Sequence, residues 1–141
     1  MANIFNKQKE EEKMLNIVST EKAPAAIGPY SQAIRCGSLV FTSGQIPCVP
    51  ETGEICGESI DTQARQSMEN VKNVLEAAGT SCDKVIKTTC FLKDMKDFAV
   101  FNTIYEQYFT GKPARSCVAV AALPKGVLCE VEAVAIIDDE K

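Results

Sequence analysis

Apolar residues recur with a helical period between residues 61 and 78. They return every three or four positions, the spacing of one face of an α-helix, at Ala64, Met68, Val71, Leu75 and Ala78. Gly79 follows directly, and glycine readily takes the left-handed conformation that often ends a helix. A second helix is predicted over residues 96–109, where one face is aromatic, with Phe98, Phe101, Tyr105 and Tyr108.

Short stretches rich in β-branched and apolar residues surround these two helices and favour extended structure. They predict strands over residues 14–19, 31–35, 39–43, 84–92, 115–122 and 127–137. Cys36, Gly37 and Ser38 form a tight-turn signal between the second and third strands. Residues 123–126 (LPKG) join the last two strands, which we expect to pair as a hairpin.

This order of elements predicts an α+β fold, a two-layer sandwich of a mixed β-sheet with two helices on one face. Residues 14–141 are expected to form a single domain, and residues 1–13 are a polar extension expected to be disordered. The second face of the sheet is predicted to be partly apolar, with Val118, Val120, Val131, Ala133 and Ala135. An apolar face of this kind is expected to be buried against another surface, and a second copy of the chain is the simplest partner.

The composition restricts the available chemistry, because the 141 residues include no His and no Trp. Without His there is no Ser-His-Asp or Cys-His nucleophile pair and no imidazole proton shuttle. Catalysis must use Arg, Lys, Glu, Asp, Tyr, Ser or Cys.

The formal net charge is −4, so the overall field repels nucleic-acid phosphates, and no nucleic-acid partner is expected. No apolar run is long enough for a membrane span, and the polar N-terminus (NKQKEEEK) does not resemble a signal peptide. A cytoplasmic protein without a membrane partner is therefore expected.

Seven cysteines are spread along the chain with no two closer than eight positions. Zinc ribbons and thioredoxin-like sites need two thiolates within one tight turn, so the spacing argues against both, and no metal site is expected. Most of the cysteines are expected to be small buried residues. Cys117 is the exception because of its position.

If the last two strands pair across residues 123–126, period-two alternation puts four functional side chains on one face of the sheet. They are Arg115, Cys117, Glu130 and Glu132. Arg115 could then hold a carboxylate with two hydrogen bonds, and Glu130 could act as acid or base toward a water. Alternatively Arg115 simply pairs with a glutamate across the strands, and spacing alone favours this structural role.

Five segments in order resemble the reactive intermediate deaminase (RidA, YjgF) family. They are APAAIGPYSQA (23–33), TSGQIP (42–47), QARQSMENVKNVLEAAG (63–79), VIKTTCFLKDMKDFAVFN (85–102) and PARSCVAVAALPKGVLCEVEA (113–133). The most specific part is P-A-R-S-C with a downstream E-x-E-A, and the resemblance covers almost all of residues 14–137.

The resemblance implies a chorismate-mutase-like fold, a homotrimer and ligand sites at the subunit interfaces. It implies that Arg115 grips the substrate carboxylate and that Glu130 handles the water. The remaining substrate-binding positions that it implies are Tyr30, Ser43, Asn102 and Cys117.

The implied activity is cofactor-independent hydrolysis of 2-enamine and 2-imino acids to 2-keto acids and ammonia. Its substrates would be 2-aminoacrylate, 2-iminobutanoate and 2-iminopropanoate, with no cofactor. Two alternatives stay open. One is a trimeric regulatory protein that binds small carboxylates without catalysis. The other is an endoribonuclease, against which the acidic charge and the missing His both count.

Overall fold

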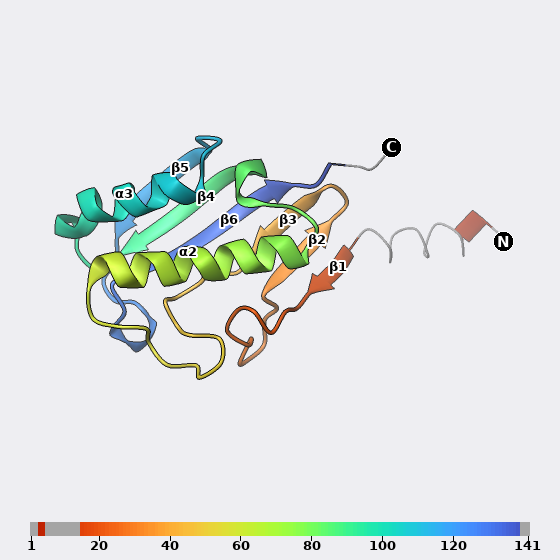
Figure 1. The fold of residues 1–141 in the computed structure, drawn as a ribbon. Coiled ribbons are helices and arrows are strands. Elements are labelled where there is room, and N and C mark those ends of the chain that lie inside the picture. The colour runs from red at the N-terminus through yellow and green to blue at the C-terminus, as the bar shows by residue number, and fades with distance from the viewer. Residues whose placement is uncertain (1–2, 5–14, 139–141) are drawn as a thin grey trace.

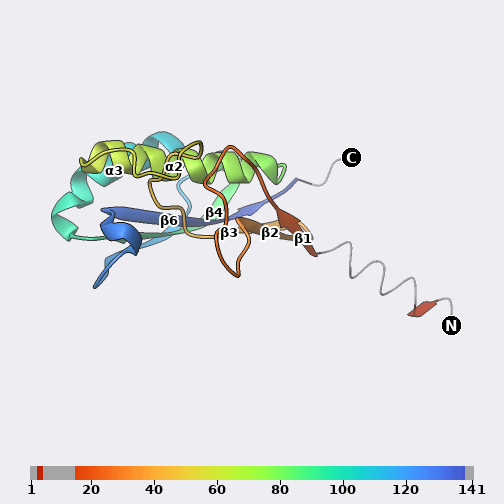
Figure 2. The ribbon, with the colours of Figure 1, turned by 90° about the horizontal axis from the view of Figure 1, so that it is seen from below.

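The computed structural model describes residues 3–4 and 15–138, which include one layer of helices on one layer of sheet (Figures 1 and 2). Apart from residues 3 and 4, the predicted N-terminal extension 1–13 lies outside the described residues. Within residues 15–138 the helices are α2 (Ile60–Ala77) and α3 (Phe98–Tyr108). Short 3₁₀ turns precede or follow the main elements, at Cys82–Lys84, Met95–Asp97 and Pro124–Gly126.

Six strands within residues 15–138 form a single mixed sheet in the order β1-β2-β3-β6-β4-β5. They are β1 (Leu15–Val18), β2 (Ala33–Cys36), β3 (Leu39–Thr42), β4 (Val85–Leu92), β5 (Ala114–Ala119) and β6 (Cys129–Ile136). Only the β4–β5 pair is parallel. The predicted α+β class, the mixed sheet and the two helices on one face are confirmed, and the element bounds agree within a few residues.

Both helices bury the faces that the periodicity predicted. Every apolar position singled out on α2 and at its C-terminus is buried, as are Phe101 and Tyr105 of α3. Gly79 has a φ of +91°, the left-handed conformation expected after a helix end. Inward-facing residues of strands β1, β2, β3, β4 and β6 complete this core, among them Val40, Cys90 and Val131.

The predicted hairpin of the last two strands is wrong. β5 pairs with β4, with Arg115 beside Thr88 and Cys117 beside Cys90. β6 lies between β3 and β4, so β4 separates β5 from β6. The physical reason is the α3 connection: a helix between two strands is long enough for a parallel crossover, and that crossover puts β5 beside the strand that precedes the helix.

The outer face of the sheet is not covered by either helix (Figure 2). The prediction of its residues is wrong in part, because Val131, Ala133 and Ala135 lie in the core instead. The large apolar side chains exposed on this outer face include Ile17 at 73%, Phe41 at 45% and Val118 at 46%. An apolar outer face therefore exists, and Val118 belongs to it as predicted, together with Ile17 and Phe41, which were not predicted.

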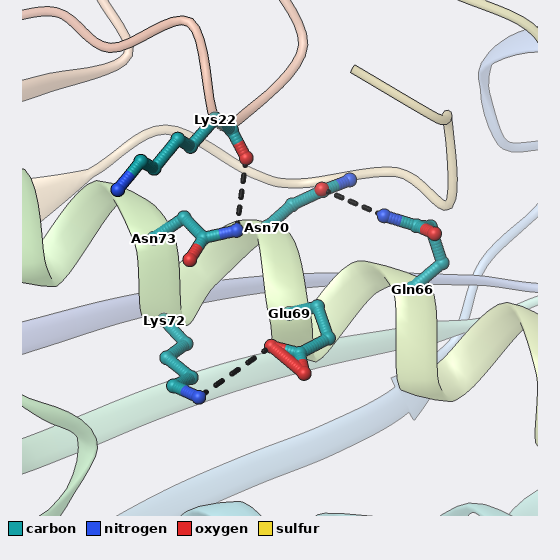
Figure 3. A network of polar contacts seen from close by, with 6 residues as sticks. All are labelled: Lys22, Gln66, Glu69, Asn70, Lys72 and Asn73. Carbon is teal, nitrogen blue, oxygen red and sulfur yellow. Dashed lines mark hydrogen bonds and ion pairs between the residues drawn. The ribbon is translucent and has the colours of Figure 1, made fainter. Parts of the chain in front are cut away.

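Polar side chains of α2 hold two segments of the chain in place (Figure 3). Asn73 Nδ2 donates to the carbonyl oxygen of Lys22 at 2.9 Å. Asn70 is buried, accepts a 2.9 Å hydrogen bond from Gln66 Nε2, and donates to the carbonyl oxygens of Ile46 and Cys48. These bonds fix the segments that lead to Tyr30 and away from Ser43.

No helix in the described part of the chain combines the length and the apolar character that crossing a membrane requires.

Candidate active site

Arg115 lies on β5 and directs its side chain toward α3. Nη1 donates a 2.6 Å hydrogen bond to Asn102 Oδ1. The guanidinium carbon lies 4.7 Å from the ring centroid of Tyr105 and 5.4 Å from that of Phe98. A guanidinium is attracted to aromatic faces and keeps its in-plane donors available when it stacks on them. The sheet edge and α3 thus hold a cation in one orientation.

Tyr105 is itself held by the strand beneath it. Its hydroxyl and the Thr88 hydroxyl are 2.6 Å apart and share a hydrogen bond. Burial raises the pKa of Tyr105, so the phenol stays neutral. The ring that supports Arg115 is therefore fixed from below by the neighbouring strand.

The guanidinium has no carboxylate partner among the residues that the structure describes, where the ion pairs are Lys72–Glu69 and Lys84–Asp138. The alternative in which Arg115 pairs with a glutamate across the strands is wrong. Arginine has five N–H donors, and Asn102 accepts from only one of them. The other donors of Arg115 have no hydrogen-bond acceptor among residues 15–138 and can bind an anion.

Cys117 lies two residues beyond Arg115 on the same face of β5. Its side chain is half-buried and packs against the core. Burial raises the pKa of Cys117, while the nearby Arg115 charge partly opposes this rise. A thiol rather than a thiolate therefore lies beside the guanidinium.

Glu130 lies on β6, opposite Phe91 of β4, and its side chain covers Gly44. A Cβ added to Gly44 would overlap Oε2 and would lie 2.8 Å from Cδ of Glu130. Only a glycine leaves room for this close approach of backbone and carboxyl. Burial raises the pKa of Glu130, and the Glu132 charge raises it further.

Ser43 and Gly44 belong to a bulge at the end of β3. Phe41 pairs with Val134, whereas Gln45 pairs with Val131, so one extra residue lies on this side of the ladder. Bulges re-aim side chains and are frequent next to active sites. The Ser43 hydroxyl donates to the Ser31 carbonyl oxygen at 2.5 Å, which connects the bulge to the segment after Tyr30.

Tyr30 is 54% exposed and lines a pocket of about 560 Å³. Gly44 and Gln45 line the same pocket, so Tyr30 and the bulge border one hollow. Gly28, with a φ of +124°, accepts a hydrogen bond from the Tyr30 N–H and turns the chain just before it. The predicted positions Tyr30, Ser43 and Glu130 therefore lie in one region.

Arg115 and Cys117 lie on the opposite face of the sheet from Glu130. In the ladder Arg115 and Cys117 share the helix-covered face with Thr88 and Cys90, and Glu130 shares the outer face with Phe91. The expectation that all of them lie on one face is wrong, because it depended on the hairpin. We call Arg115, Asn102, Tyr105 and Cys117 the arginine half-site, and Glu130, Gly44, Ser43 and Tyr30 the glutamate half-site.

Sequence reasoning missed two contributors, Tyr105 and Gly44. The aromatic face of α3 was visible in the sequence, but the position of Arg115 over it depends on β5 lying next to β4. Gly44 follows Ser43 in a loop signal, but its close contact with Glu130 is a tertiary feature.

Comparison with known proteins identifies close relatives. A sequence model of the family described as Endoribonuclease L-PSP matches residues 20–137. The 2-iminobutanoate/2-iminopropanoate deaminase of Salmonella typhimurium is 54% identical over 127 residues, covering 87% of this chain and 98% of that protein. The deaminase of the same name from Escherichia coli is 51% identical with the same coverage.

Solved structures agree with this comparison. The crystal structure of Escherichia coli TdcF with bound serine superposes with a TM-score of 0.83 at 50% identity. The match covers 87% of this chain and 99% of that one. The fold described above is therefore the fold of this relative over nearly its full length.

Proposed function

Because this chain belongs to the Endoribonuclease L-PSP family, which includes the reactive intermediate deaminases, we propose that it hydrolyses 2-imino acids and their enamine tautomers. The substrates are 2-iminobutanoate, 2-iminopropanoate and 2-aminoacrylate, and the products are 2-keto acids and ammonia. The family resemblance drawn from the sequence motifs is confirmed by these relatives.

The observation that carries the proposal is the arginine half-site. A guanidinium stacked on Tyr105 and bonded to Asn102, with no carboxylate partner in the described part of the chain, is suited to bind a carboxylate through two hydrogen bonds. Every proposed substrate carries a carboxylate next to the reacting carbon. The relative TdcF, whose structure holds serine, binds a ligand with that same group.

Glu130 supplies the proton transfer. Water adds to the C2 carbon of the imine, and ammonia then leaves as the carbonyl forms, so one water is consumed for each ammonia released. Burial raises the pKa of Glu130 toward neutral pH. A group whose pKa lies nearer the working pH can more readily both accept and return a proton. The reaction needs no electron transfer, and no cofactor takes part in this mechanism.

The two half-sites of a single copy cannot act on one substrate. They lie on opposite faces of the sheet, and β4 lies between their strands, which puts those strands about 10 Å apart. We therefore propose that the arginine half-site of one subunit faces the glutamate half-site of another. The apolar outer face around Phe41 and Val118 supports such an interface, and the family resemblance favours a homotrimer.

Complementation between two inactive variants tests this shared site. Arg115→Ala and Glu130→Gln are each expected to be nearly inactive. Mixed by co-expression in equal amounts, they should recover about one quarter of the wild-type activity, because half of the arginine half-sites are intact and half of those face an intact glutamate half-site. Activity no higher than the sum of the separate variants would contradict a site shared between subunits.

The activity itself is tested with an imine made in place. A dehydratase acting on threonine or serine releases the imino acid, and keto-acid formation is followed with and without the protein. Arg115→Ala should lose most of the acceleration, whereas Arg65→Ala, an exposed arginine on α2 that bonds Gln107, should keep it. Measurable binding of 2-oxobutanoate without any acceleration by the wild-type protein would instead support a carboxylate-binding regulatory protein.

A ribonuclease activity, which the family description names, fits the chain less well. The net charge of −4 repels the RNA backbone, and the chain has no His to act as acid or base. RNA cleavage that co-purifies with the wild-type protein and disappears in Arg115→Ala would support a ribonuclease activity.

A further inference from the structure

Two cysteines stand side by side on neighbouring strands beneath α3. Cys90 of β4 and Cys117 of β5 are directly paired in the parallel ladder, so both side chains point toward the same face of the sheet. Both are free thiols. Cys117 belongs to the arginine half-site, whereas Cys90 is fully buried and has no part in the proposed chemistry.

Their spacing matches the needs of a disulfide. Neighbouring strands lie about 4.7–4.9 Å apart, and disulfides join Cα atoms about 4.4–6.8 Å apart. The thiols are near enough for Cys117 to contribute to raising the pKa of Cys90. No other cysteine is a direct ladder partner of Cys90, since its partner on β6 is Val131.

The position of β5 allows the small movement that closing the bond requires. Among the described strands, β5 is an edge strand of six residues whose one neighbour is β4. Cys117 is the more accessible of the two thiols, so an oxidant reaches it first and Cys90 completes the bond.

We propose that Cys90 and Cys117 form a reversible cross-strand disulfide under thiol-oxidising conditions, and that this disulfide lowers the activity of the site. Each thiol loses one proton and one electron as the sulfur–sulfur bond forms. An oxidant of the diazenedicarboxamide class, such as diamide, accepts the two protons and two electrons and becomes the corresponding hydrazine.

The loss of activity follows from geometry and rests on the proposed function. The new bond draws Cys117 toward β4, and Arg115 lies two residues away on the same short strand. Displacement of a substrate-holding group by about 1 Å costs up to roughly a hundredfold in rate. A fall of roughly tenfold to a hundredfold is therefore expected after oxidation, with recovery after reduction.

Peptide mapping decides whether the bond forms. Cys129 is the other cysteine near Cys90 and is the competing partner. Trypsin releases these three cysteines in separate peptides: Cys90 in 88–93, Cys117 in 116–125 and Cys129 in 126–141. The full chain is oxidised with diamide, alkylated and digested without reductant, and the products are identified by mass spectrometry. A link between 88–93 and 116–125 is expected. No link between these two peptides, or a link from 88–93 to 126–141 in its place, would overturn the proposal.

Two variants decide whether this bond causes the loss of activity. Cys90→Val should keep the activity of the reduced protein and keep it after diamide, because Cys117 then has no partner. Cys82→Val removes a half-buried cysteine away from both half-sites and should lose activity on oxidation as the wild type does. Equal losses in Cys90→Val and wild type, or a linked wild-type protein with undiminished activity, would refute the regulatory role.

The mapping stands independently of the enzyme assay. If the reduced wild-type protein showed no deaminase activity, the proposed function would fail while the peptides would still decide whether the disulfide exists.

Discussion

Substituting Gly44 with alanine is expected to lower deaminase activity while leaving the fold intact. Gly44 has no positive φ that an alanine would strain. Its added Cβ would, however, lie 2.8 Å from Cδ of Glu130, whereas ordinary contacts begin at 3.4 Å. The carboxyl carbon must therefore move by at least about 0.6 Å, and Oε2, which the Cβ overlaps, must move further.

The expected size of the effect follows from what a misplaced acid or base loses. A positioned proton-transfer group contributes about 10²- to 10⁴-fold, and a shift of about 1 Å forfeits a large part of that. We expect kcat to fall roughly tenfold to a hundredfold, which corresponds to about 1.4–2.7 kcal/mol of transition-state stabilisation. Binding of 2-oxobutanoate should change little, because Arg115 is untouched.

The assay compares kcat and keto-acid affinity for wild type, Gly44→Ala and Gly57→Ala. Gly57 is a matched control, since its added Cβ would meet only the Thr62 side chain, at 3.1 Å. Urea unfolding checks that both variants are folded. A folded Gly44→Ala protein with wild-type kcat would refute the placement of Glu130 at the reacting water.

Three further outcomes test other parts of the site. Tyr105→Phe leaves buried Thr88 without its hydroxyl partner and should cost about 1–3 kcal/mol in urea unfolding, while a KM rise as large as that of Arg115→Ala would contradict a purely supporting role for the hydroxyl. Because burial raises the folded pKa of Glu130, the stability linked to this group is full below its ordinary pKa of 4.5 and is lost as the pH rises through the folded value. Glu130→Gln should therefore gain stability relative to wild type between acidic and neutral pH, and a difference that does not change with pH in denaturation series would count against this. Val118→Asp should reduce the mass of the assembly in analytical ultracentrifugation and reduce activity with it, so an unchanged mass would place the interface elsewhere.

The helices could be predicted from the sequence because their burial is one-sided. Residues of α2 face the sheet on one side and solvent on the other, so the period of 3.6 is visible in the chain. β6 also alternates, with Cys129, Val131, Ala133 and Ala135 buried between half-buried residues. In both elements, one local pattern encodes one buried face.

The faces of β5 could not be predicted in the same way. This edge strand has no fully buried residue, so its sequence (ARSCVA) carries no clear alternation. Its face depends on its neighbour in the sheet, and that neighbour depends on the crossover through α3 rather than on the strand that follows in the chain. A single wrong pairing was enough to place Arg115 and Glu130 together on one face.

Placing these two residues on opposite faces preserves the chemistry of both. Side by side on one face, Arg115 and Glu130 would form an ion pair, which would occupy the donors of the guanidinium and lower the pKa of the carboxyl. In the fold described here Arg115 instead stacks on Tyr105, and burial raises the pKa of Glu130. Within one copy neither group neutralises the other. If, as proposed, assembly brings them together across a cleft between subunits, Arg115 reaches that cleft stacked on Tyr105 and Glu130 reaches it with a raised pKa.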